Sequence, residues 1–423
     1  MKQVLTALFL LTLALSLTAN AQWQFVKYFP DTTFQGNLGC HGVATDPDGK
    51  VWLMRYGASY TFPGGEGVAR QIFVYNADGT PASFNGFYTF NLGGVPETLW
   101  NSNRGMRADE NGNILFAEYD ALYRVDYKTG AAMAKGIPDL DNTTITPGVD
   151  AIGEIFSGRV IPKGPIVVSA SDITYLGNVC DSAEGYSRCL DVSSDGNDVY
   201  WCGYTTGYGA VRLHSDNGSI GPYVAAETLG VGMNTESIGF QPVTGYLWIS
   251  SGNNYTPAVG WTNFTWYAFD LTTKKVVDSL TWDNSDGRNS DPRPRGIAWS
   301  PGGDTAYVGA FNAEGGCVQM FKKGPVSVQP IANTVPDKYA LSQNYPNPFN
   351  PSTEIQFSIP QGGLTTVKVY DVLGKEVATI VNDNLAPGTY KTRLDGTRLA
   401  SGTYIYTLTS GNTRISKKMM LMK

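Results

Sequence analysis

Histidine is scarce in this sequence: His41 and His214 are the only two among 423 residues. A metal centre built from several histidines is therefore disfavoured, and histidine-based acid–base catalysis has few candidates. Charged residues are also sparse, at 16%, whereas glycine is abundant at 49 residues and aromatic residues reach 12%. This composition is typical of β-sheets joined by tight turns, and it disfavours a helical bundle.

Long apolar runs are missing except at the N-terminus. Val4–Leu17 is an uncharged apolar run that follows Lys2, and Ala19-Asn20-Ala21 fits a small-x-small cleavage site. This pattern predicts a signal peptide over residues 1–21, removed on export. A transmembrane anchor is the alternative, but a membrane span needs about 20 apolar residues and this run is shorter. We therefore expect an exported protein with no transmembrane segment in its mature chain.

Basic residues are outnumbered in the main part of the chain. Residues 22–336 contain 20 Lys and Arg against 31 Asp and Glu, a net charge of −11, whereas residues 337–423 carry a net +4. A negative surface repels phosphate backbones, so nucleic acid is not an expected partner.

Cysteines are few, and no Cys-x-x-Cys pair supports a zinc ribbon or a thioredoxin-type site. Export permits disulfides, although the odd number of cysteines, five, leaves at least one thiol free. Cys189 faces Cys202 across an expected hairpin, whereas Cys180 falls in an expected loop. Directly opposed strand positions strain a bridge, so we predict a Cys180–Cys189 disulfide, with Cys202 a buried free thiol. Cys40 and Cys317 could form a second bridge.

A hairpin recurs along the chain, with an Asp- and Gly-rich turn between two apolar strands. Five copies have their turn glycines at Gly49, Gly112, Gly196, Gly245 and Gly303. A poorer copy at residues 155–170 turns at Pro162-Lys163-Gly164. Six such units of roughly 40–50 residues predict an all-β fold, a six-bladed β-propeller over residues 22–323. A multi-sheet sandwich is the alternative, and it explains the hairpins less well.

The segment Trp23–Phe29 is a spare strand, which we expect to complete the sheet of the sixth unit and close the ring. The recurring Gly-x-x-x-Asp-x-x-Gly-x-[VI]-[WL] hairpin makes residues 23–323 resemble the six-bladed propellers of the NHL-repeat, streptogramin-lyase and gluconolactonase-like group. Gluconolactonase-like members hold a divalent metal with Glu, Asn and Asp. No matching set is found here, so no cofactor is identified, and a divalent metal stays an open alternative.

The C-terminal part differs in composition. Residues 324–338 are rich in proline and small residues, which predicts a linker. In residues 339–423, apolar and polar residues alternate in short segments that are separated by turns. This pattern predicts a small Ig-like β-sandwich.

This part also carries four motifs in a fixed order, which are Asn344-Tyr-Pro-Asn-Pro-Phe-Asn350, Tyr370-Asp-Val-Leu-Gly374, Gly402-Thr-Tyr404 and the basic end from Lys417 to Lys423. They closely resemble the type A C-terminal sorting domain of the type IX (Por) secretion system of Bacteroidetes. The resemblance implies recognition by that secretion machinery after passage through the periplasm, and a secreted or cell-surface location.

Polar residues before inner strands and after second strands are expected to meet at the channel mouth of a propeller, where ligands bind. His41 and Glu236 are the candidate catalytic pair, with roles in acid–base chemistry. The candidate ligand-binding residues are Arg55, Arg104, Glu118, Arg188, Asn253 and Arg295. The same positional rule also selects Glu154, Asp172, Tyr204 and Glu314.

We therefore expect a ligand-binding or surface interaction module. Carbohydrate is a candidate ligand, because aromatic and amide residues gather between Asn253 and Tyr267. The alternatives are a secreted hydrolase or lyase with its active site at the channel mouth, and a structural adhesin.

Overall fold

The computed structural model describes residues 23–31, 39–56, 60–61, 68–136, 145–205, 207–254, 256–285, 287, 291–311, 318–323, 329–332, 336–396 and 399–422. The chain divides into two compact units, one of which is Trp23–Lys323 and the other of which includes Gly324–Lys423. Apart from the 3-10 helix η1 (Gly218–Ile220), every described element is a strand, which confirms the all-β prediction. Among the described residues, no helix is long and apolar enough to cross a membrane.

The Trp23–Lys323 unit contains six sheets of three or four strands. In sheet order they are β2 (Cys40–Thr45), β3 (Val51–Arg55) and β6 (Ile72–Tyr75); β9 (Asn103–Ala108), β10 (Ile114–Glu118), β11 (Leu122–Val125) and β12 (Ala132–Gly136); β13 (Gly148–Val149), β14 (Ile155–Gly158), β15 (Gly164–Ser169) and β16 (Tyr175–Ala183); β17 (Leu190–Val192), β18 (Asp198–Cys202), β19 (Ala210–His214) and β20 (Val224–Leu229); β21 (Ile238–Phe240), β22 (Leu247–Ser250), β23 (Thr265–Asp270) and β24 (Lys275–Thr281); and β25 (Arg293–Trp299), β26 (Thr305–Phe311), β27 (Val318–Lys323) and β1 (Trp23–Tyr28). Two further hairpins are β4 (Tyr60–Thr61) with β5 (Val68–Ala69), and β7 (Thr89–Leu92) with β8 (Val95–Thr98).

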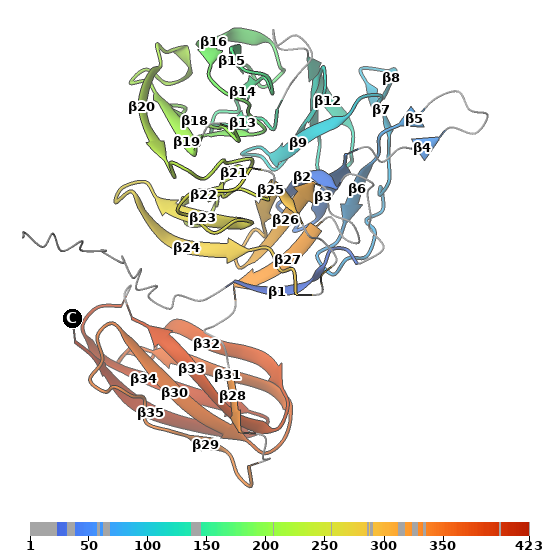
Figure 1. Ribbon diagram of the computed structural model, residues 1–423. Coiled ribbons are helices and arrows are strands. Elements are labelled where there is room, and N and C mark those ends of the chain that lie inside the picture. The colour runs from blue at the N-terminus through green and yellow to red at the C-terminus, as the bar shows by residue number, and fades with distance from the viewer. Residues whose placement is uncertain are drawn as a thin grey trace, which may run out of the picture. The chain divides into compact units, whose positions relative to one another are not determined.

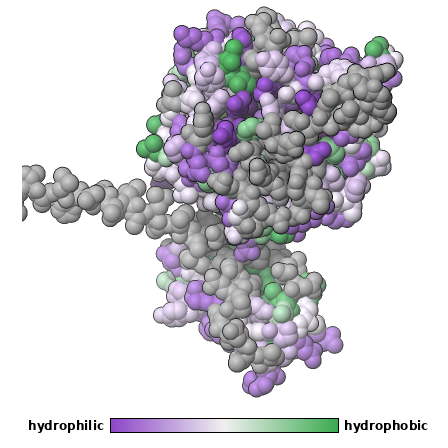
Figure 2. Space-filling view, turned by 45° about the vertical axis from the view of Figure 1, so that its right-hand side comes forward, coloured by the Kyte–Doolittle hydropathy of each residue, from purple (hydrophilic) through white to green (hydrophobic). Residues whose placement is uncertain are grey.

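The first strands of these sheets lie towards the middle of the unit, so that the arrangement is propeller-like (Figure 1). Strand β2 contacts β9 and β25, and β17 contacts β13 and β21. Large apolar side chains fill the space between adjacent sheets; Trp52 of one sheet and Phe116 of the next are fully buried in a shared cluster. On the face that Figure 2 shows, the coloured residues are mostly hydrophilic, and the hydrophobic ones form small separate patches.

Aspartate side chains fold the hairpin turns that recur in the sequence. Oδ1 of Asp46 accepts hydrogen bonds from the backbone amides of Asp48 and Lys50, at 3.0 and 2.9 Å. Asp109 repeats this pattern with the amides two and four residues further on, both at 2.8 Å. Gly49 completes the first turn with φ of 80°, a conformation that residues with a Cβ rarely adopt. The Asp and Gly of the motif are therefore explained by turn formation.

The third sheet corrects the unit predicted around residues 155–170. Its first hairpin joins β13 to β14 through Asp150, whose Oδ1 accepts amide hydrogen bonds from Ile152 and Glu154, at 3.1 and 2.9 Å. The predicted turn at Pro162–Gly164 instead joins β14 to β15, the second and third strands. Glu154 and Asp172 consequently lie at the hairpin-turn end of this sheet. Strand β13 has only two residues, too few to show an alternating pattern.

The expected pairing of the spare N-terminal segment with the sixth sheet is confirmed. Strand β1 pairs antiparallel with β27 and forms the outermost strand of the sheet that begins with β25. The first residue pair is Trp23 with Lys323, and a bulge lies between Phe25 and Lys27. The two ends of this unit are thus joined in one sheet.

The predicted Cys180–Cys189 disulfide is absent, since both sulfurs are free thiols. Cys180 is not in a loop, as the prediction assumed, but in β16, where it pairs with Ile166. Cys189 packs in a different cluster, with its Sγ 3.2 Å from the carbonyl oxygen of Ile238. Cys202 is a buried free thiol, as predicted. Cys317 lies outside the described residues.

The C-terminal unit consists of two four-stranded sheets around one apolar core. In sheet order the strands are β28 (Gln329–Ala332), β33 (Gly388–Asp395), β30 (Ser352–Ile359) and β29 (Ala340–Leu341); and β32 (Glu376–Leu385), β31 (Gly363–Tyr370), β34 (Gly402–Ser410) and β35 (Thr413–Leu421).

The segment that follows β29 is attached to both the core and the terminal strand. The Asn344 side chain is buried and donates hydrogen bonds to the Pro346 carbonyl and to Oγ1 of Thr353, both at 3.0 Å. Phe349 is buried in the core, and its backbone amide donates to the carbonyl of Met420 over 2.9 Å. The Asn-Pro-rich motif and the C-terminal strand are therefore built as one structure.

Candidate functional site

A cavity of about 470 Å³ opens in the Trp23–Lys323 unit where several first strands begin. Its titratable side chains include four arginines, one glutamate and one histidine, so its net charge is positive, opposite in sign to the net −11 of residues 22–336. We name it the arginine cavity; it is lined by His41, Tyr56, Arg104, Tyr186, Arg188, Tyr204, Thr205, Glu236, Arg293, Arg295 and Phe311.

The charged groups of the cavity come from corresponding places in different sheets. His41 lies in β2, Arg104 in β9 and Arg295 in β25, each near the start of its strand. Arg188 and Glu236 lie two residues before β17 and β21. Because these strands converge, side chains far apart in the sequence meet in one cavity.

Glu236 is the acidic centre of this network and is only 3% exposed. One carboxylate oxygen forms an ion pair with Nη1 of Arg295. The other accepts a hydrogen bond from Nδ2 of Asn253 over 2.7 Å. The amide of Asn253 is itself fixed, because its oxygen accepts from the backbone of Thr256 at 2.9 Å. Buried charges need this kind of pairing to be stable.

His41 is held as a neutral imidazole. Its Nε2 accepts a hydrogen bond from Nε of Arg295 over 3.2 Å, and its ring stacks on Tyr56 with centroids 4.4 Å apart. Burial, followed by the charges of Arg295, Arg188 and Arg104, holds the pKa of His41 well below its usual value. The imidazole therefore contributes no positive charge to the cavity at neutral pH.

Arg104 and Arg188 lie against tyrosine rings. The guanidinium of Arg104 is 5.0 Å from the Tyr119 ring centroid and 5.7 Å from that of Tyr56. Arg188 lies 4.7 Å from the Tyr204 ring and donates from Nη2 to its hydroxyl over 3.1 Å. Such stacking fixes the plane of a guanidinium and leaves its edge available.

Neither of these two arginines has a carboxylate partner of its own in the described part of the chain. Among the described residues, no carboxylate forms an ion pair with Arg104, and the nearest to Arg188 is Glu236 at 4.0 Å, which Arg295 already holds. Nε of Arg104 and Nε of Arg188 are both buried without a hydrogen-bond acceptor in the described part of the chain. Burial and repulsion by Arg188 lower the pKa of Arg104, although nearby tyrosines oppose the shift.

The structure brings together most of the predicted site residues. His41, Arg104, Arg188, Glu236 and Arg295 line the cavity, and Asn253 supports it from behind through Glu236. Tyr204, which follows the second strand β18, also lines it. Glu314 lies outside the described residues.

Arg55 and Glu118 are not among the lining residues, and the cause is a one-residue offset. Each is the last residue of a second strand, and the next residue, Tyr56 or Tyr119, faces Arg104 instead. Successive side chains of a strand point to opposite faces, so the neighbour takes the inward position. Arg55 packs over Phe73 at 4.7 Å.

Glu118 is buried away from the cavity. Its Oε2 lies 3.5 Å from the Tyr123 hydroxyl, and burial, with the nearby charge of Asp120, raises its pKa to about 8.

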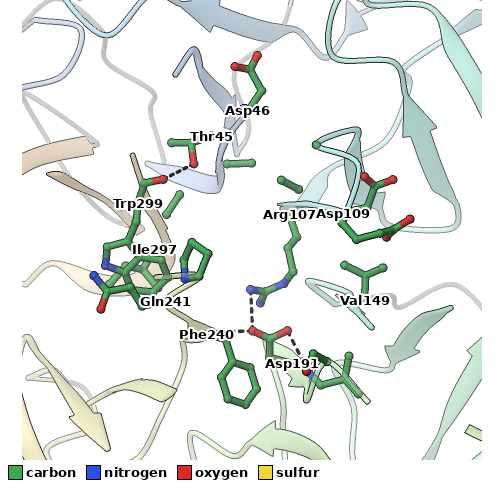
Figure 3. Close-up of a pocket in the computed structure, with 18 of the residues that line it drawn as sticks. Thr45, Asp46, Arg107, Asp109, Val149, Asp191, Phe240, Gln241, Ile297 and Trp299 are labelled. Carbon is green, nitrogen blue, oxygen red and sulfur yellow. Dashed lines mark hydrogen bonds and ion pairs between the residues drawn. The ribbon is translucent and has the colours of Figure 1, made fainter. Parts of the chain in front are cut away.

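A second cavity, of about 680 Å³, lies at the hairpin-turn ends of the first strands, and its lining is mainly apolar (Figure 3). Arg107 reaches across its centre towards Asp191, with Nη1 2.9 Å from the carboxylate. Arg107 also donates to the carbonyls of Pro147, Leu190 and Ile238, at 2.8, 3.2 and 3.1 Å. Arg107 therefore binds several sheets together, which is a structural role.

The described residues do not form a ready set of ligands for a metal ion. Within the described ranges, no group of three or more His, Cys, Asp or Glu side chains is placed to hold a metal ion. The gluconolactonase-like metal site thus gains no support from these residues.

Comparison with sequence families identifies the C-terminal unit. Residues 343–422 match the family of secretion-system C-terminal sorting domains, Por_Secre_tail. The sorting domain shows that the protein is exported to the cell surface or the medium, with the type IX secretion machinery as its partner. Comparison with curated proteins found no match.

Several solved structures resemble the chain at low identity. Two structures of the extracellular domain of BT4673 from B. thetaiotaomicron share 12% identity over 95% of this chain, with TM-scores of 0.41 and 0.45; this chain spans 58% and 59% of theirs, less than two thirds. Regucalcin from Agrobacterium tumefaciens, described as a calcium-binding protein, shares 15% identity over 70% of this chain and 93% of its own, with a TM-score of 0.47. At these values the similarities say nothing about the ligand of this chain.

Proposed function

We propose that this protein is an exported binding module, in which a six-bladed β-propeller carries the ligand site and an Ig-like sandwich is the sorting tail. The six sheets with converging first strands support the propeller. The two sheets around one core support the sandwich. The proposed order is a signal peptide (1–21), the propeller (22–323), a linker (324–338) and the sorting domain (339–423).

The observation that carries this proposal is the fixed geometry of the arginine cavity. Charged and aromatic side chains from several sheets converge on one concave site, as in small-molecule sites that are formed before the ligand arrives. The Glu236 carboxylate is held on both oxygens, by Arg295 and by Asn253. A site held in this way loses little conformational entropy on binding.

A carbohydrate suits the rim of the cavity. Tyr186 is 41% exposed there, and its ring lies 5.8 Å from that of Tyr204, so an aromatic face is available for stacking on a sugar. The predicted aromatic excursion supports this less, because Trp261 donates to the Val231 carbonyl over 2.9 Å and Trp266 is fully buried.

The test is a binding screen on the full-length exported protein. Thermal shift followed by calorimetry against polar small molecules and glycans should find one ligand that binds with a 1:1 ratio. Tyr204→Ala, which removes the ring beneath Arg188, should weaken that binding, whereas Tyr175→Ala, an exposed tyrosine outside the cavity, should not. Equal binding by both variants would show that the ligand binds outside the arginine cavity.

The alternative is a secreted hydrolase or lyase that uses His41 and Glu236. It is favoured by the presence of both groups in one cavity. However, Arg295 already donates to His41 Nε2 and pairs with Glu236, so each candidate base would have to break an existing contact. Turnover of a bound glycan that is lost in the His41→Gln variant would support the hydrolase or lyase alternative.

A further inference from the structure

The nature of the ligand can be inferred from the charges of the arginine cavity, and this inference rests on the proposed binding function. We infer that the cavity binds the oxyanion group of an acidic small molecule, such as the carboxylate of a sugar acid, with Arg104 and Arg188 as the groups that hold it. Neutral sugars of the same size are then poor ligands.

The first argument is the pairing of the four arginines. Arg295 has Glu236 as its partner, and Arg293 lies 3.4 Å from the carboxylate of Asp291. Among the described residues Arg104 has no ion-pair partner, and Arg188 has only Glu236, 4.0 Å away and already paired with Arg295. Each of the two arginines has a buried Nε–H without a hydrogen-bond acceptor in this part of the chain. Buried donors without acceptors are costly, and a bound oxyanion would accept from both.

The second argument is geometric. The Tyr204 ring beneath Arg188, with its hydroxyl 3.1 Å from Nη2, restricts the rotation of that guanidinium. Tyr56 and Tyr119 restrict Arg104 in the same way. Planar guanidinium groups held by stacking present paired N–H donors, which match the two oxygens of a carboxylate.

The third argument is electrostatic. The cavity is positive although residues 22–336 carry a net charge of −11, so its charge does not follow from the composition. Burial, and after it repulsion by Arg188, lowers the pKa of both Arg104 and Arg295. An anion in the cavity would relieve this repulsion.

The experiment compares three probes by calorimetry on the full-length exported protein. Digalacturonate is a sugar acid, citrate is an acid without a sugar, and galactobiose is a neutral disaccharide. We expect digalacturonate to bind at least about tenfold more tightly than galactobiose, and increasing NaCl to weaken its binding. Binding of digalacturonate alone identifies a sugar acid, whereas equal binding of citrate identifies a general carboxylate site; both results support the inference.

Variants then test the two arginines. R104Q/R188Q should weaken acid binding about tenfold or more, whereas R212Q, outside the cavity and paired with Asp198 and Glu227, should leave it within about twofold. If the double variant does not fold, the salt dependence of the unmodified protein decides. Equal binding of galactobiose, unaffected by salt or by R104Q/R188Q, would overturn the inference and leave the binding module intact. Failure of every probe would also overturn it, while the broader ligand screen tests the binding module separately.

Discussion

Arg295 donates a hydrogen bond from Nε to Nε2 of His41 over 3.2 Å. The same guanidinium pairs through Nη1 with Glu236, so that one buried arginine connects the histidine and the glutamate of the cavity. The burial of Arg295 lowers its pKa to about 10, even though Glu236 opposes the shift. At neutral pH the guanidinium remains charged, and the imidazole acts only as its acceptor.

Removing Arg295 should therefore destabilise the propeller unit. Arg295→Met leaves the buried Glu236 without its positive partner, which typically costs about 3–5 kcal/mol. Urea unfolding followed by tryptophan fluorescence measures this loss. In Arg295→Met/Glu236→Gln the unpaired charge is gone, and much of the stability should return. A loss below about 1 kcal/mol in the single variant would show that the pair contributes little.

His41 should make stability depend on pH below neutrality. Its pKa in the folded protein lies well below about 6.5, its value in the unfolded chain. Under those conditions the unfolded chain binds the proton first, so stability is complete above about pH 6.5 and is lost as the pH falls below it. Unfolding at pH 7.0 and 5.5 should show this loss in the unmodified protein and less of it in His41→Gln. An identical pH dependence in the two proteins would contradict this reasoning.

Glu118 should act in the opposite direction. Burial raises its pKa from 4.5 to about 8, so the folded state keeps the proton longer than the unfolded chain. Its contribution to stability is complete below about pH 4.5 and is lost as the pH rises towards 8. Glu118→Gln cannot ionise and should be more stable than the unmodified protein by up to a few kcal/mol at pH 8.5, with little difference at pH 5. Thermal unfolding at the two pH values measures both comparisons.

Turn chemistry made most of the fold predictable from the sequence. Asp46 and Asp109 form the same amide-capped turn, and both were recognisable because apolar strands of five or six residues flank them. Asp150 forms the same turn but follows a strand of two residues, which carries no pattern. The Asp-x-x-Gly spacing from Asp150 to Gly153 was the remaining signal for that hairpin.

The site was predictable in position but not in orientation. His41 and Arg295, chosen because they lie at the starts of first strands, line one cavity, since strand order alone places them at one end of the unit. At the ends of second strands, a shift of one residue exchanges the two faces, so Arg55 was predicted where Tyr56 faces the cavity. Arg295 forms an ion pair with Glu236, whereas Arg104 forms none with a described residue. This difference depends on where the side chains are placed, and no sequence pattern predicts it.

Arg107 should be important for stability rather than for ligand binding. Arg107→Met removes the donors to three backbone carbonyls and leaves Asp191, which is 3% exposed, without its cationic partner. We expect a loss of about 3–5 kcal/mol in urea unfolding. Arg212→Met is the matched control, because its ion pairs are more exposed to solvent and should contribute about 1 kcal/mol or less. Equal losses of stability in the two variants would contradict the proposed structural role of Arg107.

Deletion of Ser416–Lys423 should retain the protein in the periplasm. This deletion removes most of β35, which pairs with β34 along its full length and buries Met419 and Leu421 in the core of the sorting domain. It also removes the Lys418 carbonyl, which accepts a hydrogen bond from Gln343 over 2.7 Å and connects the strand to the Asn-Pro-rich motif. The Trp23–Lys323 unit has its own core, so limited proteolysis of the retained protein should still release a stable fragment of that unit. Lys417→Gln/Lys418→Gln removes two positive charges but leaves Met419 and Leu421 in the core. This variant therefore tests the charge of the strand separately from its contribution to the fold. Cell fractionation of the three proteins measures the outcome, and normal release of the truncated protein would contradict the role of this strand in sorting.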